Sequence, residues 1–255
     1  MNLRAIFSRA SNPADQESLN EQLRVAAKNG YHAKAEKLLE QGANADAPGA
    51  KKVEPLMLAA LRGDELMCRL LLMHGANPDA GSPGEPAGTA LTQAVREGFF
   101  DVVKTLVEFK ANIDLKEYSR TPLHEALWKN RTEIARFLVE NGASMEVHDR
   151  MGRTPMEEVI SLGDKLLAGF MVDKGANLDF ENDGGTSMKD LMRAEGWHDV
   201  VDAAAERDAL KAQMLADAAA AVVQAEADFK GEMEAVHILK NPVRALKPVS
   251  FRQRA

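Results

Sequence analysis

The sequence has a single cysteine and no long apolar run, which argue against an internal disulfide and a membrane-spanning helix. Cys68 is the only cysteine among 255 residues, so the chain cannot form an internal disulfide, and we expect a reducing, cytoplasmic location. No apolar run approaches the roughly 18 residues that a membrane-spanning helix needs. No membrane span is therefore predicted.

Aromatic residues and basic charge are also scarce. Aromatic side chains make up 5% of the chain, and alanine, leucine and methionine supply most of the apolar mass, which suits thin, closely packed helices. The formal net charge is −7, so nothing overall favours nucleic acid or an anionic membrane as a partner. We expect no nucleic-acid partner.

Residue patterns that carry chemistry are missing as well. The six histidines are scattered, without the spacing to a cysteine or carboxylate that a metal site needs. The glycines and prolines of 81–88 lack the Lys-Ser/Thr ending of a phosphate-binding loop. Cys68 lies among leucines and methionines and reads as a packed thiol, since nothing near it in sequence would lower its pKa. The sequence predicts no enzyme, no cofactor and no metal.

What the chain does have is a repeated unit of about 33 residues, best developed over 120–152. Thr121 can cap a helix that begins with Pro122, and a second apolar stripe over 134–139 ends at Asn141-Gly142. Arg153-Thr154-Pro155 then repeats Arg120-Thr121-Pro122. A helix pair this small cannot bury its own apolar faces, so the copies must stack.

Aligned on Thr121, the units start at Glu21, Glu54, Thr89, Thr121, Thr154 and Thr186. A turn residue for which a positive φ is expected recurs between the two helices of each unit, at Gly30, Gly63, Gly98, Asn130 and Gly163. The second helices end in motifs such as QGAN at 41–44, HGAN at 74–77 and KGAN at 174–177.

These motifs, with TPLHEA at 121–126, resemble the ankyrin repeat, and the resemblance covers 18–201. It implies an all-α solenoid of helix–turn–helix units with β-hairpin-like fingers between them. The first unit, which lacks TPLH, and the sixth, which never reaches a second GAN, are expected to be caps. The finger over 75–89 is two residues longer and should be kinked. The histidine of TPLH, here His124, is expected to hydrogen-bond backbone groups and to tie neighbouring units together.

Outside the repeats, the chain divides into an N-terminal segment, 1–17, a helical extension, 202–240, and a flexible basic tail, 241–255. The extension carries one apolar stripe. It either shields the last repeat or binds a partner or a second copy, and Gly231 could divide it into two helices. The tail is either solvated or docks on an acidic surface.

Function is therefore expected on the surface, on the concave face made by finger tips and first helices. By their offsets, units three to five should expose Glu85, Gln93, Arg96, Glu97, Glu117, Tyr118, Arg120, Glu125, Trp128, Lys129, Arg150, Met151, Arg153, Glu158 and Leu162. From these we select as partner-binding residues Tyr118, Arg120, Glu125, Trp128, Lys129, Arg150, Met151, Arg153 and Arg96.

Two features decide this selection. Binding hot spots favour tryptophan, tyrosine and arginine, and the central unit holds one of the two tryptophans and one of the two tyrosines. Arg120 and Arg153, one unit apart, should form a positive row suited to acidic side chains. The competing interpretations are that Trp128 packs across the turn between helices and that the arginines are solvated finger tips.

The sequence thus favours a non-enzymatic module that binds another protein on its concave face. The alternative is a structural protein that self-associates, or docks into a larger complex, through 202–240 and the basic tail.

Overall fold

The computed structural model describes residues 12–48, 53–79, 81–82, 88–182 and 184–240, with side chains up to 225 and those of 227 and 229. The chain divides into two compact units that meet between Val201 and Asp202. The helices of the first unit come in pairs, and α12 continues into the second. Their bounds are α1 Pro13–Asn29, α2 His32–Glu40, α3 Pro55–Ala60, α4 Glu65–Met73, α5 Ala90–Glu97, α6 Phe100–Glu108, α7 Pro122–Trp128, α8 Thr132–Glu140, α9 Pro155–Leu162, α10 Lys165–Asp173, α11 Met188–Ala194 and α12 His198–Lys240.

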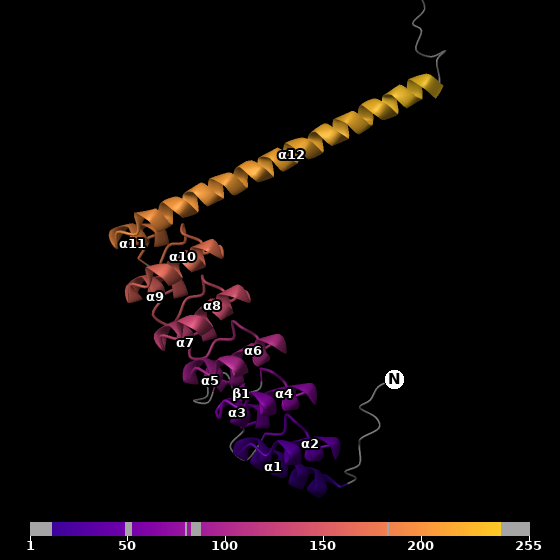
Figure 1. Ribbon diagram of the computed structural model, residues 1–255, viewed down its shortest axis with the longest axis vertical. Helices are drawn as coiled ribbons and strands as arrows, with labels where there is room; N and C mark the ends of the chain where they lie inside the picture. The colour runs from indigo at the N-terminus through magenta and orange to yellow at the C-terminus, as the bar shows by residue number, and fades with distance from the viewer. Residues whose placement is uncertain (1–11, 49–52, 80, 83–87, 183, 241–255) are drawn as a thin grey trace, which may run out of the picture. The chain divides into compact units, whose positions relative to one another are not determined.

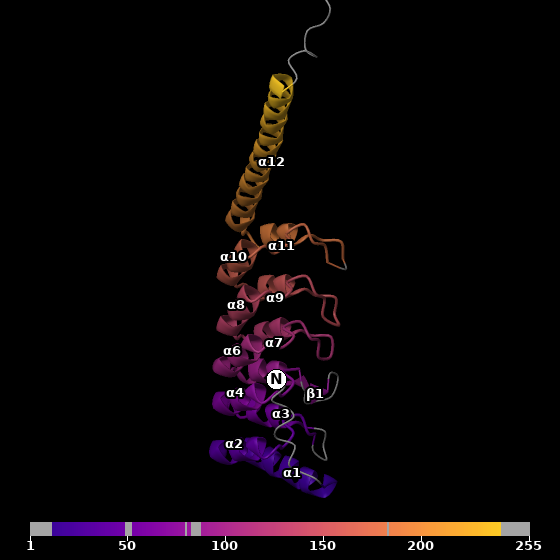
Figure 2. The same ribbon diagram turned by 90° about the vertical axis from the view of Figure 1, so that its right-hand side faces the viewer.

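Within the first unit the helix pairs stack in two layers. The first helices of the pairs (α1, α3, α5, α7, α9 and α11) form one layer, and α2, α4, α6, α8 and α10 form the other (Figures 1 and 2). The loops between pairs project away from the first helices as fingers (Figure 2). The predicted all-α solenoid with fingers is confirmed.

A buried leucine or methionine recurs at one equivalent position of each helix in the pairs from α1 to α11. In the first helices these buried residues are Leu23, Leu56, Leu91, Leu123, Met156 and Met188, and in the second helices Leu38, Leu71, Leu106, Leu138 and Met171. Because they recur once per unit, each pair buries its apolar stripe against its neighbours, as a stacked array requires.

Side-chain caps begin most of the first helices. The hydroxyls of Thr89, Thr121, Thr154 and Ser187 accept hydrogen bonds from backbone N–H groups in the first turn. The sixth unit therefore starts at Ser187, and the predicted start at Thr186 is one residue early. The first helix begins at Pro13, with Asn12 as its cap, so it starts ahead of the predicted Glu21 and crosses the expected boundary at 17/18.

The turns inside the pairs have the predicted conformation. Gly30, Gly63, Gly98 and Gly163 have φ values between 69° and 83°, and Asn130 has φ 53°. Only glycine adopts this left-handed region without cost, and asparagine tolerates it better than most residues. The repeated glycine is thus explained by the turn.

Carboxylates connect successive fingers. The side chains of Asp46, Asp79 and Asp114 accept hydrogen bonds from the backbone N–H of Asn77, Asn112 and Ser144, at 2.6–2.9 Å. Each bond joins one unit to the next, which fixes the spacing of the finger bases. In the longer finger between units two and three, β1 (Gly81–Ser82) pairs antiparallel with β2 (Gly88–Thr89); the kink expected in its central part, and Glu85, lie outside the described residues.

The sixth pair ends differently from the others. After α11 the chain turns at Gly196 and enters α12, which runs without a break from His198 to Lys240. The expectation that Gly231 divides this stretch is wrong, because a single glycine costs a long helix only about 1 kcal/mol relative to alanine. Among the described residues, no helix is long and apolar enough to cross a membrane. The basic tail, 241–255, lies outside the described residues.

Candidate functional site

The finger between units three and four closes in a two-residue hairpin turn. Glu117 and Arg120 exchange two backbone hydrogen bonds of 2.8 Å, and the two residues between them, Tyr118 and Ser119, have φ 46° and 70°. Two consecutive left-handed residues define the turn type that suits a two-residue hairpin. This backbone holds the Tyr118 side chain out into solvent, 51% exposed.

The finger between units four and five has one more residue, and the side chain of Asp149 stabilises its turn. The Asp149 carboxylate oxygen Oδ1 accepts hydrogen bonds from the backbone N–H of Met151 (2.7 Å) and Arg153 (3.0 Å). Gly152, with φ 74°, completes the turn. As a result Met151 stands at the tip, 66% exposed, with the exposed Arg150 beside it.

Trp128, at the end of α7, is 55% exposed and carries two cations. The guanidinium of Arg120 lies 5.0 Å from the ring centroid, and the Lys129 ammonium lies 4.4 Å from it. Cations at this distance are attracted by the negative face of the ring. The ring is therefore exposed and oriented by its neighbours, and the interpretation that it only packs across the turn does not account for its exposure.

A row of ion pairs runs beside these side chains. The Arg96 guanidinium lies 3.4 Å from Glu117 Oε2 and 3.5 Å from Glu125 Oε2. Arg120 Nε and Arg153 Nη2 lie 4.0 and 3.6 Å from the same oxygen, Asp149 Oδ2. The two arginines expected to form a positive row thus share one buried carboxylate of the chain itself, which offsets part of their charge.

Four residues that the offsets placed on the surface are buried, so the expectation of exposure is wrong for them: Gln93, Glu117, Glu125 and Glu158. Glu125 and Glu158 are each only 5% exposed. The reason is the stacking of units, which brings long arginine side chains over the first helices, as Arg96 shows at Glu125. Glu117 is covered differently: its carboxylate packs against the backbone of Gly88, where a Cβ would lie 2.2 Å from it and would displace it.

Burial changes the ionisation of this row. Desolvation raises the pKa values of Glu117 and Glu158, against the opposing charges of nearby arginines. Burial would also raise the pKa of Asp149, but hydrogen bonds from the backbone of Arg153 and Met151 outweigh it and leave the pKa lowered. The row therefore holds two carboxylates whose ionised form is poorly stabilised and one whose ionised form is well stabilised.

His124 has the structural role that the resemblance implied. Its Nδ1 accepts the Thr121 backbone N–H at 3.3 Å, and its Nε2 donates to the backbone carbonyl of Arg153 at 3.3 Å. The second bond joins units four and five. Cys68 is also packed as predicted: it is fully buried, and burial raises its pKa to about 12.

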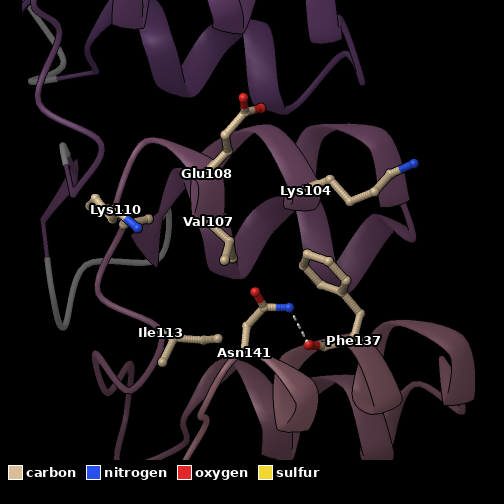
Figure 3. Close-up of a pocket in the computed structure, with 8 residues that line it drawn as sticks. Lys104, Val107, Glu108, Lys110, Ile113, Phe137 and Asn141 are labelled. Carbon is tan, nitrogen blue, oxygen red and sulfur yellow. Dashed lines mark hydrogen bonds between the residues drawn. The ribbon is translucent and has the colours of Figure 1, made fainter.

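The second helices form a hollow of about 550 Å³ between α6 and α8. Figure 3 shows Lys104 and Glu108 of α6 on one side of it and Phe137 and Asn141 on the other. Asn141 Nδ2 donates to the Phe137 carbonyl at 2.8 Å. None of the selected partner-binding residues lines this hollow. Within the described part of the chain, no group of three or more histidine, cysteine or acidic side chains could hold a metal ion.

The structure therefore gathers most of the selected residues along three neighbouring units. Tyr118, Trp128, Arg150 and Met151 are exposed, Arg96, Arg120, Lys129 and Arg153 are half-buried, and Glu125 is buried. The sequence did not indicate that Asp149 supports a turn and pairs with two arginines. It also did not indicate that Glu117 and Glu158 are buried. For Asp149 a signal existed, since it stands where Asn182 stands in the next finger, whose side chain makes the same pair of backbone bonds.

Comparisons with known proteins agree with this architecture. A family model described as ankyrin repeats, in three copies, matches residues 23–117 and 56–149. The chain is 31% identical over 117 residues to cyclin-dependent kinase inhibitor 2A of Homo sapiens, covering 46% of this chain and 74% of that protein. It is 38% identical over 95 residues to an ankyrin repeat protein of fowlpox virus (strain NVSL), covering 36% of this chain and 21% of that protein. A match to protein phosphatase 1 regulatory subunit 12A of Mus musculus, 36% identical over 66 residues, covers 26% of this chain and 6% of that protein.

Proposed function

The chain belongs to the ankyrin repeat family, and from that premise we propose that it is a non-enzymatic, cytoplasmic module that binds another protein on its concave face. The binding residues proposed are Tyr118, Arg120, Trp128, Lys129, Arg150, Met151, Arg153 and Arg96, with Glu125 beneath them. Protein–protein interaction is what the relatives' names also suggest, one being a kinase inhibitor and another a phosphatase regulatory subunit.

The observation that carries the proposal is the exposure of three large side chains on neighbouring rigid supports. Tyr118, Trp128 and Met151 are each more than half exposed, although the chain has few aromatic residues. Tight turns hold Tyr118 and Met151, and two cations hold Trp128. A preformed surface loses little conformational entropy on binding, so such anchors can contribute most of the affinity.

A pull-down from native cytosol tests the proposal. The baits are the intact protein, the Tyr118→Ala/Trp128→Ala variant, and a control, Leu166→Ala, which removes an apolar side chain that is 84% exposed on α10. Partners that bind the intact protein and the control but not the double variant support the concave face. Equal recovery of every partner on all three baits contradicts it.

A second candidate function, self-association through the 202–240 helix, is favoured by one observation. Six apolar side chains of this helix are more than half exposed: Leu210, Met214, Leu215, Val222, Val223 and Phe229. Exposed apolar area of this kind often marks a contact with another molecule. Sedimentation of the intact protein and of the Leu215→Glu/Val222→Glu variant tests it: dimers in the first and monomers in the second are expected.

A further inference from the structure

Glu125 and Glu158 are equivalent residues on neighbouring helices, and each has one carboxylate oxygen that receives no hydrogen bond from the described residues, although Arg96 forms an ion pair with that of Glu125. Each lies in the fourth position of its helix, α7 or α9. Each is 5% exposed, and in the described part of the chain neither Oε2 atom receives a hydrogen bond. A buried carboxylate oxygen without a donor costs stability, and a group that donates to it recovers that cost.

The protein's own guanidiniums do not satisfy this pair. Arg96 is shared between Glu125 and Glu117, at 3.5 and 3.4 Å, which is long for a charge-assisted hydrogen bond of about 2.7–2.9 Å. Arg120 and Arg153 both turn to Asp149, although they are near enough to Glu158 to affect its pKa. The row thus sets three guanidiniums against four carboxylates, and its loose pairs can be exchanged for better ones.

Exposed apolar side chains flank the two carboxylates on the same helices. Trp128 follows Glu125 by three residues and Leu162 follows Glu158 by four, spacings that put each pair on one helix face. Trp128 and Leu162 are 55% and 54% exposed. A partner segment that reaches the carboxylates would therefore bury apolar area on both sides of them.

We infer that Glu125 and Glu158 form an acceptor for an arginine side chain of the partner, with apolar residues of the same segment resting on Trp128 and Leu162. Arginine fits because its planar group presents donors in two directions, so one side chain can donate to both carboxylates. The inference rests on the proposed function, since it names the chemical group of the partner that the concave face would bind. It also reverses the sign first expected: the partner brings positive charge to this point.

The test uses the full chain and a random peptide library displayed on phage. A selected peptide is synthesised twice, with its arginine and with citrulline, a neutral isostere, and both are titrated against four proteins. These are the wild type, Glu125→Gln/Glu158→Gln, Trp128→Ala, and Glu133→Gln, a control that removes an exposed carboxylate on α8. Thermal unfolding of each variant checks its fold.

We expect the selected peptides to be rich in arginine, and citrulline to weaken binding to the wild type and to the control about tenfold or more, the scale of losing one buried charged contact. In Glu125→Gln/Glu158→Gln the arginine and citrulline peptides should bind equally, which isolates the pairwise contact. An unchanged arginine preference in that variant overturns the inference. If peptides bind without arginine dependence and lose affinity with Trp128→Ala, the inference fails while the proposed function stands. If no peptide is selected, both fail; if Trp128→Ala leaves an arginine-dependent affinity unchanged, the seating of apolar residues on Trp128 is overturned.

Discussion

The guanidinium of Arg120 lies 5.0 Å from the centre of the Trp128 ring, although the two side chains come from different parts of the unit. Arg120 ends the finger, and Trp128 ends the helix that follows it. Because Arg120 also approaches Asp149 of the next finger, one side chain connects the exposed aromatic ring to the buried ion pairs. The exposed Trp128 ring and the buried ion pairs are therefore connected through the Arg120 side chain.

Replacing Trp128 with alanine should weaken partner binding by about 2 kcal/mol or more, the range of interface hot spots, and leave the free energy of unfolding within about 0.5 kcal/mol. The ring is more than half exposed, so little core packing is lost. Calorimetric titration and urea unfolding measure the two effects. Leu166→Ala should change neither quantity, and a large loss of stability in Trp128→Ala would show that the ring is a packing element instead.

Asp149→Ala should destabilise the array by about 2–4 kcal/mol, because it removes two backbone hydrogen bonds and the counter-charge of two arginines. Asp149→Asn should cost less, since Asn182 makes the same backbone bonds in the next finger with a neutral amide. Urea unfolding of the two variants separates the turn from the charge. Equal losses would mean that the charge contributes most of the effect.

His124→Ala should cost about 1–3 kcal/mol, because it removes the reciprocal cap with Thr121 and the bond to the Arg153 carbonyl. Burial lowers the pKa of His124 below 6.5, so the unfolded chain binds this proton more readily than the folded one. The stability that His124 contributes should therefore be fully present above pH 6.5 and fall below it. Denaturant unfolding between pH 5 and 8 measures this; a difference between wild type and variant that does not vary with pH would argue against a neutral, buried ring.

Glu158→Gln should raise stability at neutral pH. Burial raises the pKa of Glu158 above 4.5, so the folded state holds this proton more tightly than the unfolded state. Wild-type stability attributable to Glu158 therefore falls as the pH rises from 4.5 through the folded pKa. The advantage of the glutamine variant should grow over that window and then level off. A variant less stable than the wild type at pH 7 would show that the carboxylate is already well paired.

The repeat could be predicted from the sequence because single residues recur at fixed offsets. Gly30, Gly63 and Gly98 each take the positive φ that their shared offset indicated. The sixth start was misplaced by one residue, since Thr186 and Ser187 are both able to cap a helix and only the finger geometry selects Ser187. Gly231 does not divide α12, because the free-energy cost of one glycine, about 1 kcal/mol relative to alanine, is too small to interrupt a long helix.

The burial of the site could not be predicted in the same way. Offsets place Glu125 and Glu158 among the exposed residues of their helices, whereas both are buried, and Glu125 has an arginine of another unit, Arg96, beside it. Arg120 and Arg153 were expected to act together, and they do, but toward Asp149. The sequence pattern indicates on which side of a helix a residue lies, whereas its contacts with neighbouring units depend on the length and direction of the side chains.

Site-specific photocrosslinking of the intact protein tests the central claim most directly. A photoreactive phenylalanine is placed in turn at Tyr118, Met151, Leu166 and Leu215, all of them exposed positions, and each protein is irradiated in native cytosol. A partner on the concave face predicts one shared crosslinked protein from Tyr118 and Met151 and none of it from Leu166 or Leu215. Crosslinks from Leu215 alone, with none from the two finger tips, would contradict the account and assign binding to the 202–240 helix.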